Sequence, residues 1–131
     1  MACHCRACQK MTASAFSLSV AIPADGFRVT RGEPVIGGLH GASRHYFCPY
    51  CMSWLFTRPQ GVEFFVNVRS TALNGDEWKT PFIETSTNEK LPWASTPARR
   101  SYPAFPADEA YPALIAEFQD WAKEIVEADK R

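Results

Sequence analysis

The chain has 131 residues, 46% of them hydrophobic and 13% aromatic, a composition that excludes a disordered segment and predicts one domain with an ordinary core. Lysine and arginine total 14, as do aspartate and glutamate, so the basic excess typical of proteins that grip phosphate backbones is absent and we expect no nucleic-acid partner. No run approaches the roughly 18 apolar residues of a membrane span, and the first residues, MACHCR, form no apolar signal region, so we expect a cytoplasmic protein with no membrane association.

Alternating apolar residues predict a series of short strands. In residues 15–22 every second side chain is apolar, which indicates a half-buried strand with one face made of Phe16, Leu18, Val20 and Ile22. The same reasoning predicts further strands at 27–30, 35–36, 43–47, 54–56, 62–69 and 82–85. Turn-forming residues separate several of these segments, as at 23–26 and 74–76.

The C-terminal segment is the one clear helix in the pattern. An apolar stripe recurs there at helical spacing, formed by Leu114, Phe118, Trp121 and Ile125. Pro112 fits the first turn, where its missing N–H is harmless. We therefore expect a mainly β fold in a single domain, 1–131, with a β core over 1–107 and a helix over 108–129 whose apolar stripe packs on the sheet.

The sequence Cys48-Pro49-Tyr50-Cys51 lies between two predicted strands. Two thiolates at this spacing can reach one ion from a single tight turn, so we interpret them as half of a structural zinc site rather than as two small buried apolar residues. His45 is the nearest histidine in sequence, but alternation along a strand directs its side chain away from that of Cys48.

Three more cysteines, Cys3, Cys5 and Cys8, lie within the first eight residues. One loop can fold thiols at this spacing around one ion. Three protein ligands with an open fourth position describe a catalytic zinc, and four protein ligands describe a structural one. His4 could be the fourth ligand, but we expect it to point away because neighbouring side chains in an extended segment diverge.

Five cysteines is an odd number, which disfavours a disulfide framework and, in a reducing cytosol, favours metal ligands. Two alternatives remain open. Cys5 and Cys8 could join Cys48 and Cys51 in one zinc-ribbon site, although the gap between the two pairs is long and Cys3 would be left over. The pair Cys5-x-x-Cys8 could also be a redox motif, although the βαβ setting of that motif is missing.

The sequence CHCRACQK at 3–10, followed by SAF at 14–16, resembles the first zinc loop of the glutathione-dependent formaldehyde-activating enzyme family. FCPYC at 47–51 resembles the second cysteine knuckle of that family, and KLPW at 90–93 resembles its Lys-x-Pro-Trp segment. The resemblance extends from residue 2 to about residue 106. The joint pattern is specific, whereas each piece alone is not.

The resemblance implies a β-tent fold of antiparallel sheets. It also implies a carbon–sulfur lyase that forms or cleaves S-hydroxymethylglutathione, the adduct of formaldehyde and glutathione. In the same way it implies that a catalytic zinc is held by Cys3, Cys5 and Cys8, and that a structural zinc is held in part by Cys48 and Cys51. Three thiolates suit a zinc that exchanges its open ligand for a substrate thiolate.

Two nearby cations, Arg6 and Lys10, could pair with a glutathione carboxylate, but we interpret them as ordinary solvated charges. The family completes its structural zinc with a Cys-x-Cys strand before the first zinc loop, whereas this sequence begins at Met1. We therefore expect a shortened N-terminus and at most one well-occupied zinc per chain. Ala13 also stands where glycine is common in the family.

Two functional hypotheses follow from the resemblance. The first is a lyase acting on glutathione or a related thiol, and the second is a non-catalytic zinc-binding interaction module of the same fold. An open zinc position would favour the lyase, and a closed one would favour the module.

Overall fold

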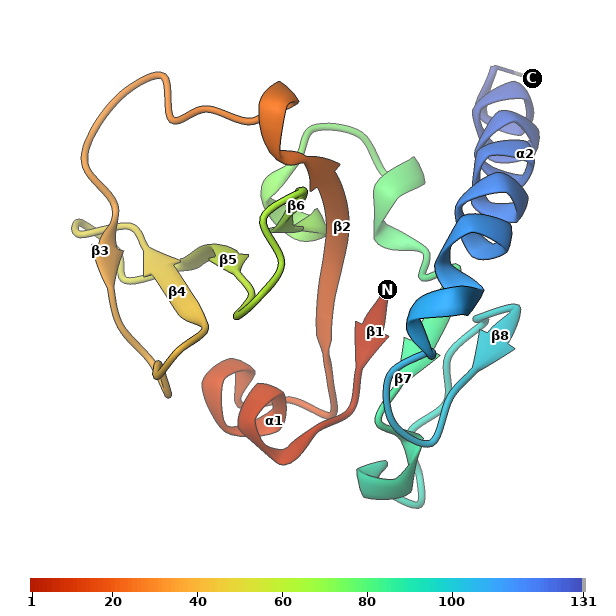
Figure 1. The fold of residues 1–131 in the computed structure, drawn as a ribbon, viewed down its shortest axis with the longest axis horizontal. Coiled ribbons are helices and arrows are strands. Elements are labelled where there is room, and N and C mark those ends of the chain that lie inside the picture. The colour runs from red at the N-terminus through yellow and green to blue at the C-terminus, as the bar shows by residue number, and fades with distance from the viewer. Residues whose placement is uncertain (131) are drawn as a thin grey trace.

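The computed structural model describes residues 1–130, and within them β-strands outnumber α-helices (Figure 1). In chain order the strands and α-helices are β1 (Ala2–Cys3), α1 (Arg6–Thr12), β2 (Ser17–Pro23), β3 (Val35–Ile36), β4 (Arg44–Phe47), β5 (Trp54–Arg58), β6 (Phe65–Arg69), β7 (Ile83–Thr85), β8 (Arg100–Ser101) and α2 (Tyr111–Asp129). The expected mainly β fold with cysteine loops and a C-terminal helix is confirmed. The short helix α1 is not among the predicted elements.

Within residues 1–130 the eight strands form one sheet in the order β3-β4-β5-β6-β2-β1-β7-β8. Neighbouring strands are antiparallel, except that β1 and β7 are parallel and β7 and β8 are parallel. These two pairings correct the expectation of purely antiparallel sheets. Parallel neighbours need a long crossover, and β1 has one because Ala2 pairs with Glu84, far along the chain.

Most predicted strands form, with bounds that differ by one or two residues, but two predictions need correction. Residues 27–30 are not a strand. Phe27 reaches the core from an irregular segment, with its ring centroid 4.8 Å from that of Phe56, while Val29 is 44% exposed. The predicted strand 62–69 begins only at Phe65, and Phe64 is 69% exposed. The alternation of apolar residues does not by itself reveal whether a neighbouring strand is present to pair with the segment.

The pairing register gives the sheet one apolar face. Val20 and Ile22 of β2 pair with Val68 and Val66 of β6, and Phe56 of β5 pairs with Val68. Directly paired residues have side chains on the same face of a sheet, so these five residues share one face. Val66 is fully buried in the core that results.

The opposite face is polar, and part of it is buried as well. Cys3 pairs with Ser17, and Ser19 pairs with Arg69, which places these four residues on one face. Ser17 is 3% exposed and Ser19 is 2% exposed, less than the apolar residues beside them in β2. Ser17 is covered by the cysteine loop, because its Oγ donates a hydrogen bond of 3.1 Å to Cys8 Sγ.

Helix α2 packs at the β7–β8 end of the sheet (Figure 1). Leu114 and Trp121 are buried against Phe82, next to β7, and the ring centroids of Phe82 and Trp121 are 5.3 Å apart. Ion pairs join Arg99 to Glu124 (2.8 Å) and Arg100 to Glu117 (3.0 Å) across the same contact. In the part of the chain that the structure describes, no helix combines the length and the apolar character needed to cross a membrane.

Candidate metal centre

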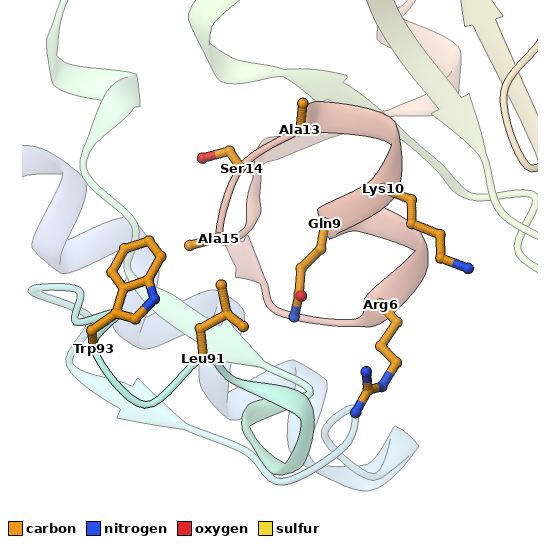
Figure 2. Close-up of a pocket in the computed structure, with 8 residues that line it drawn as sticks. All are labelled: Arg6, Gln9, Lys10, Ala13, Ser14, Ala15, Leu91 and Trp93. Carbon is orange, nitrogen blue, oxygen red and sulfur yellow. The ribbon is translucent and has the colours of Figure 1, made fainter.

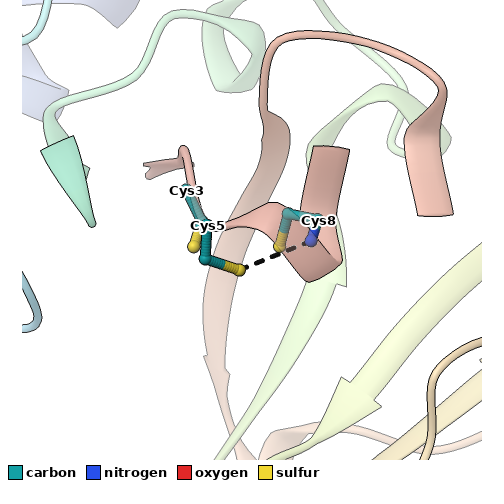
Figure 3. Close-up of side chains that lie close together, drawn as sticks. All are labelled: Cys3, Cys5 and Cys8. Atoms are coloured by element: carbon teal, nitrogen blue, oxygen red, sulfur yellow. Dashed lines mark hydrogen bonds between the residues drawn. The ribbon is translucent and has the colours of Figure 1, made fainter. Parts of the chain in front are cut away.

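The N-terminal segment brings Cys3, Cys5 and Cys8 together. Cys3 ends β1, which is held between β2 and β7. Cys5 caps α1, and its Sγ accepts the backbone N–H of Cys8 at 3.4 Å. The three Sγ atoms lie within 4.8 Å of one another. Figure 3 shows the three cysteine side chains close together. Helix α1 then ends at Thr12, and the capping residue Ala13 has a φ of 51° and a ψ of 38°, in the left-handed region that favours glycine.

This group of three thiols could hold a metal ion. Zinc–sulfur bonds of about 2.3 Å in a tetrahedral site put the sulfurs roughly 3.8 Å apart. The sulfurs here, all within 4.8 Å of one another, are near enough to share one ion. Cys3 is 4% exposed and Cys8 is 9% exposed, so two of the sulfurs are largely shielded from water.

The three thiols also shift one another's pKa values. Hydrogen bonds with Cys5 and Cys8 lower the pKa of the Cys3 thiol to about 2. The hydrogen bond with Cys3 in turn raises the pKa of Cys8, and burial raises it further. The ionisation of each thiol therefore depends on the other two, and a bound metal ion would stabilise their ionised forms.

Cys48 and Cys51 form a separate turn. Cys48 N–H donates to the backbone oxygen of Ser53 at 2.9 Å, and a hydrogen bond with Ser53 Oγ lowers the pKa of the exposed Cys51 thiol. His45 Nδ1 lies 2.8 Å from Thr57 Oγ1 on β5. Among residues 1–130 no third histidine, cysteine, aspartate or glutamate joins this pair in a metal-sized group, and the N-terminal cysteines do not join it, so the zinc-ribbon alternative is not observed.

Residues 1–88 match the family model described as glutathione-dependent formaldehyde-activating enzyme. The chain belongs to this family. The match covers 88 of the 131 residues and contains all five cysteines, whereas the KLPW sequence at 90–93 lies beyond it. No curated protein matches the chain.

In this member of the formaldehyde-activating family, His4 points away from the neighbouring cysteines. Its side chain is fully buried, with Nε2 2.9 Å from Glu84 Oε2 and the ring edge-on to Phe16 at a centroid distance of 5.3 Å. The backbone N–H of His4 also donates to the oxygen of Thr85 on β7 at 3.0 Å. His4 therefore anchors the cysteine loop to β7.

Glu84 is the residue of this anchor that sequence reasoning missed. Besides His4, its carboxylate contacts Lys90 Nζ (3.2 Å), Thr96 Oγ1 (2.9 Å) and Ser101 Oγ (2.7 Å). Burial alone would raise the pKa of Glu84, but the hydrogen bonds from Ser101, Thr96, His4 and Lys90 outweigh it and lower the pKa from 4.5 to about 2. Glu84 is the one charged residue of β7. A charged side chain within a strand needs polar partners when the strand is buried, and this feature of the sequence could have indicated the anchor.

Replacing the Glu84 carboxylate should make the free energy of unfolding less dependent on pH in the acidic range. Because the pKa of Glu84 is depressed on folding, its contribution is present above about pH 4.5 and is lost as the pH falls towards about 2. We expect Glu84→Gln to lower the free energy of unfolding of the metal-free protein by on the order of 2 kcal/mol at neutral pH, and by less near pH 3.

Urea unfolding at both pH values measures this difference, with Glu127→Gln at an exposed position of α2 as the matched control. If Glu84→Gln lowered the free energy of unfolding equally at neutral and acid pH, the charge of Glu84 would not stabilise the anchor.

A cleft of about 530 Å³ lies beside α1, lined by Arg6, Gln9, Lys10, Ala13, Ser14, Ala15, Leu91 and Trp93 (Figure 2). Gln9 Nε2 donates to the backbone oxygens of His4 (2.7 Å) and Glu89 (3.0 Å), which ties α1 to the opposite wall. Arg6 and Lys10 are exposed, and Figure 2 shows the Lys10 side chain pointing away from the cleft wall formed by residues 91 and 93.

Proposed function

We propose that the protein is a zinc-dependent carbon–sulfur lyase that forms or cleaves the adduct of formaldehyde with glutathione or a related thiol. The observation that carries this proposal is the convergence of three cysteine sulfurs without a fourth histidine, cysteine, aspartate or glutamate ligand among residues 1–130. Three protein ligands with a fourth position left for substrate are typical of catalytic zinc. The family membership supports the same reaction.

Cys3, Cys5 and Cys8 would hold the zinc. When bound, the ion would supply a Lewis acid that lowers the pKa of a substrate thiol, so that the thiolate is available at neutral pH. In adduct formation the substrate sulfur attacks the carbon of formaldehyde, a C–S bond forms, and the carbonyl electron pair moves to oxygen, which takes up a proton. Cleavage reverses these changes.

The protein's own residues would position and shield this reaction. Ser17 Oγ donates to Cys8 Sγ, which orients that ligand, and the His4–Glu84 pair fixes the loop that carries Cys3 and Cys5. Because the chemistry needs reduced thiols, and all five cysteines are free, we infer a reducing compartment such as the cytoplasm.

A non-catalytic zinc-binding module is the second candidate. Two exposed aromatic residues favour it: Tyr50 in the Cys48–Cys51 turn is 95% exposed, and Trp93 is 75% exposed. Exposed aromatic side chains are frequent at protein–protein interfaces.

Exchange spectroscopy of formaldehyde and glutathione distinguishes the two candidates. The zinc-loaded protein should accelerate interconversion of the free compounds and their adduct, and removal of the zinc by a chelator should abolish the acceleration. A zinc-loaded protein that leaves the exchange rate unchanged would contradict a lyase that acts on glutathione and would favour the module.

A further inference from the structure

Arg69, the last residue of β6, is a buried arginine that no carboxylate among residues 1–130 pairs with. The residue is 7% exposed. Its Nε and Nη1 atoms are buried and have no hydrogen-bond partner in the described part of the chain. A buried charge is costly unless an opposite charge lies near it. The compensating negative charge must therefore come from groups other than aspartate and glutamate.

The strand register places Arg69 beside the N-terminal cysteines. Arg69 pairs with Ser19 of β2. Two residues earlier on the same face of β2, Ser17 pairs with Cys3 and donates a hydrogen bond of 3.1 Å to Cys8 Sγ. Residues two apart on a strand are separated by about 7 Å, a distance that an arginine side chain can span. The guanidinium and the cysteine sulfurs therefore lie on the same side of the sheet.

The charge of Arg69 and the charges of the thiolates stabilise each other. Burial lowers the pKa of Arg69 to about 10, while the negative charges of Cys8 and Cys3 act in the opposite direction and raise it. The guanidinium is thus charged at neutral pH. Because both partners are shielded from water, their attraction is stronger than that of a surface pair.

Trp54 fixes the position of this cation without neutralising it. The Cζ atom of Arg69 lies 3.8 Å from the centroid of the Trp54 ring. Trp54 is itself held, because its Nε1 donates to Thr57 Oγ1 at 3.1 Å. An aromatic ring attracts a cation but carries no formal charge. The positive charge therefore stays available to the cysteine group, from a place that does not depend on a flexible side chain.

We propose that Arg69 is the built-in counter-charge of the metal centre, and that its charge lets the fourth metal position accept an anionic ligand in preference to a neutral one. A zinc ion held by three thiolates has a net charge of about −1, so an incoming anion is repelled unless a cation offsets that charge. The inference rests on the proposed function and assigns Arg69 a role in it. Arg69 is a positioning residue, because it acts through the field at the metal.

Ligand binding to the cobalt(II)-loaded protein tests this role, since the visible absorption of cobalt reports its fourth ligand. The two probes are 2-mercaptoethanol, which binds as a thiolate and has no carboxylate, and imidazole, which binds as a neutral ligand. Arg69→Met should lower the affinity for the thiolate roughly 10- to 100-fold and change that for imidazole by less than about 2-fold. The readout is the ratio of the two affinities. A site that is merely distorted would bind both ligands more weakly and leave the ratio unchanged.

Two variants serve as controls. Arg69→Lys keeps the positive charge and should keep most of the preference for the thiolate. Arg58→Met removes an exposed arginine of the neighbouring strand β5 and should leave both affinities unchanged. An affinity ratio that is the same in Arg69→Met and in the unmodified protein would overturn the proposal. A preference lost in Arg69→Lys as well as in Arg69→Met would also overturn it, because the charge is still present in the lysine variant.

The remaining outcomes are decided by metal uptake and by the exchange assay. If Arg69→Met takes up no cobalt, uptake by Arg69→Lys supports the counter-charge, and failure of both variants overturns it. The two probe ligands need no catalysis. A protein without formaldehyde–glutathione exchange activity whose affinity ratio depends on Arg69 therefore keeps this proposal and loses the lyase. An active protein whose ratio does not depend on Arg69 keeps the lyase and loses this proposal.

Discussion

The Cys8→Ser variant should lose its zinc and its lyase activity together. Serine replaces a soft thiolate by a poor zinc ligand, and two remaining cysteines leave the ion weakly held. Changes to residues that only support metal ligands reduce affinity about 10- to 100-fold, so loss of a ligand should cost at least as much. Metal analysis of the purified protein and the formaldehyde–glutathione exchange rate measure the two effects.

The matched control is Cys51→Ser, which changes an exposed cysteine outside the N-terminal group. We expect it to leave the N-terminal zinc and the exchange rate unchanged, in line with at most one well-occupied zinc per chain. If Cys8→Ser retained full zinc and full activity, Cys8 could not be a ligand of the catalytic metal.

The Trp121→Ala variant should be the most destabilised of the substitutions considered for α2. Trp121 is 7% exposed and contacts Phe82 and Phe118, with ring centroids 5.3 Å and 5.8 Å away. Truncating a buried tryptophan typically lowers the free energy of unfolding by about 3–5 kcal/mol, through lost burial and the cavity that is left. Chemical unfolding followed by circular dichroism measures the change.

Ile115→Ala provides the comparison within the same helix, because Ile115 is 51% exposed. Exposed positions away from special contacts usually change stability by less than about 0.5 kcal/mol. Equal unfolding free energies for Trp121→Ala and Ile115→Ala would mean that α2 contributes little to the fold.

The elements that the sequence predicts best are those with a long, regular pattern. Helix α2 was predicted from the apolar stripe at Leu114, Phe118, Trp121 and Ile125, and strand β2 from the apolar alternation at 15–22. Each of these spacings matches the geometry of one kind of element. The cysteine motif similarly indicated a group of three donors, which the fold brings together. The short helix α1 was not predicted, because its seven residues form too few helical turns for a periodic pattern of apolar residues to be visible.

The buried polar residues could not be placed from the sequence, because their environment depends on distant segments. Glu84 is stabilised by His4 and Ser101, and Arg69 stacks on Trp54, contacts that only the strand order creates. Ser17 appeared as the polar side of a half-exposed strand, yet it is buried because the cysteine loop covers it. Local pattern indicates which residues are polar, whereas topology decides which of them meet.

The number of sulfur atoms bound to the zinc tests the central claim most directly. X-ray absorption at the zinc edge can count them in the Cys51→Ser variant, where the N-terminal cysteines are the only group of three metal donors among residues 1–130. We predict three sulfurs without added thiol and four after glutathione is added. Four protein sulfurs before any thiol is added, or a count that glutathione does not change, would contradict a catalytic zinc at Cys3, Cys5 and Cys8.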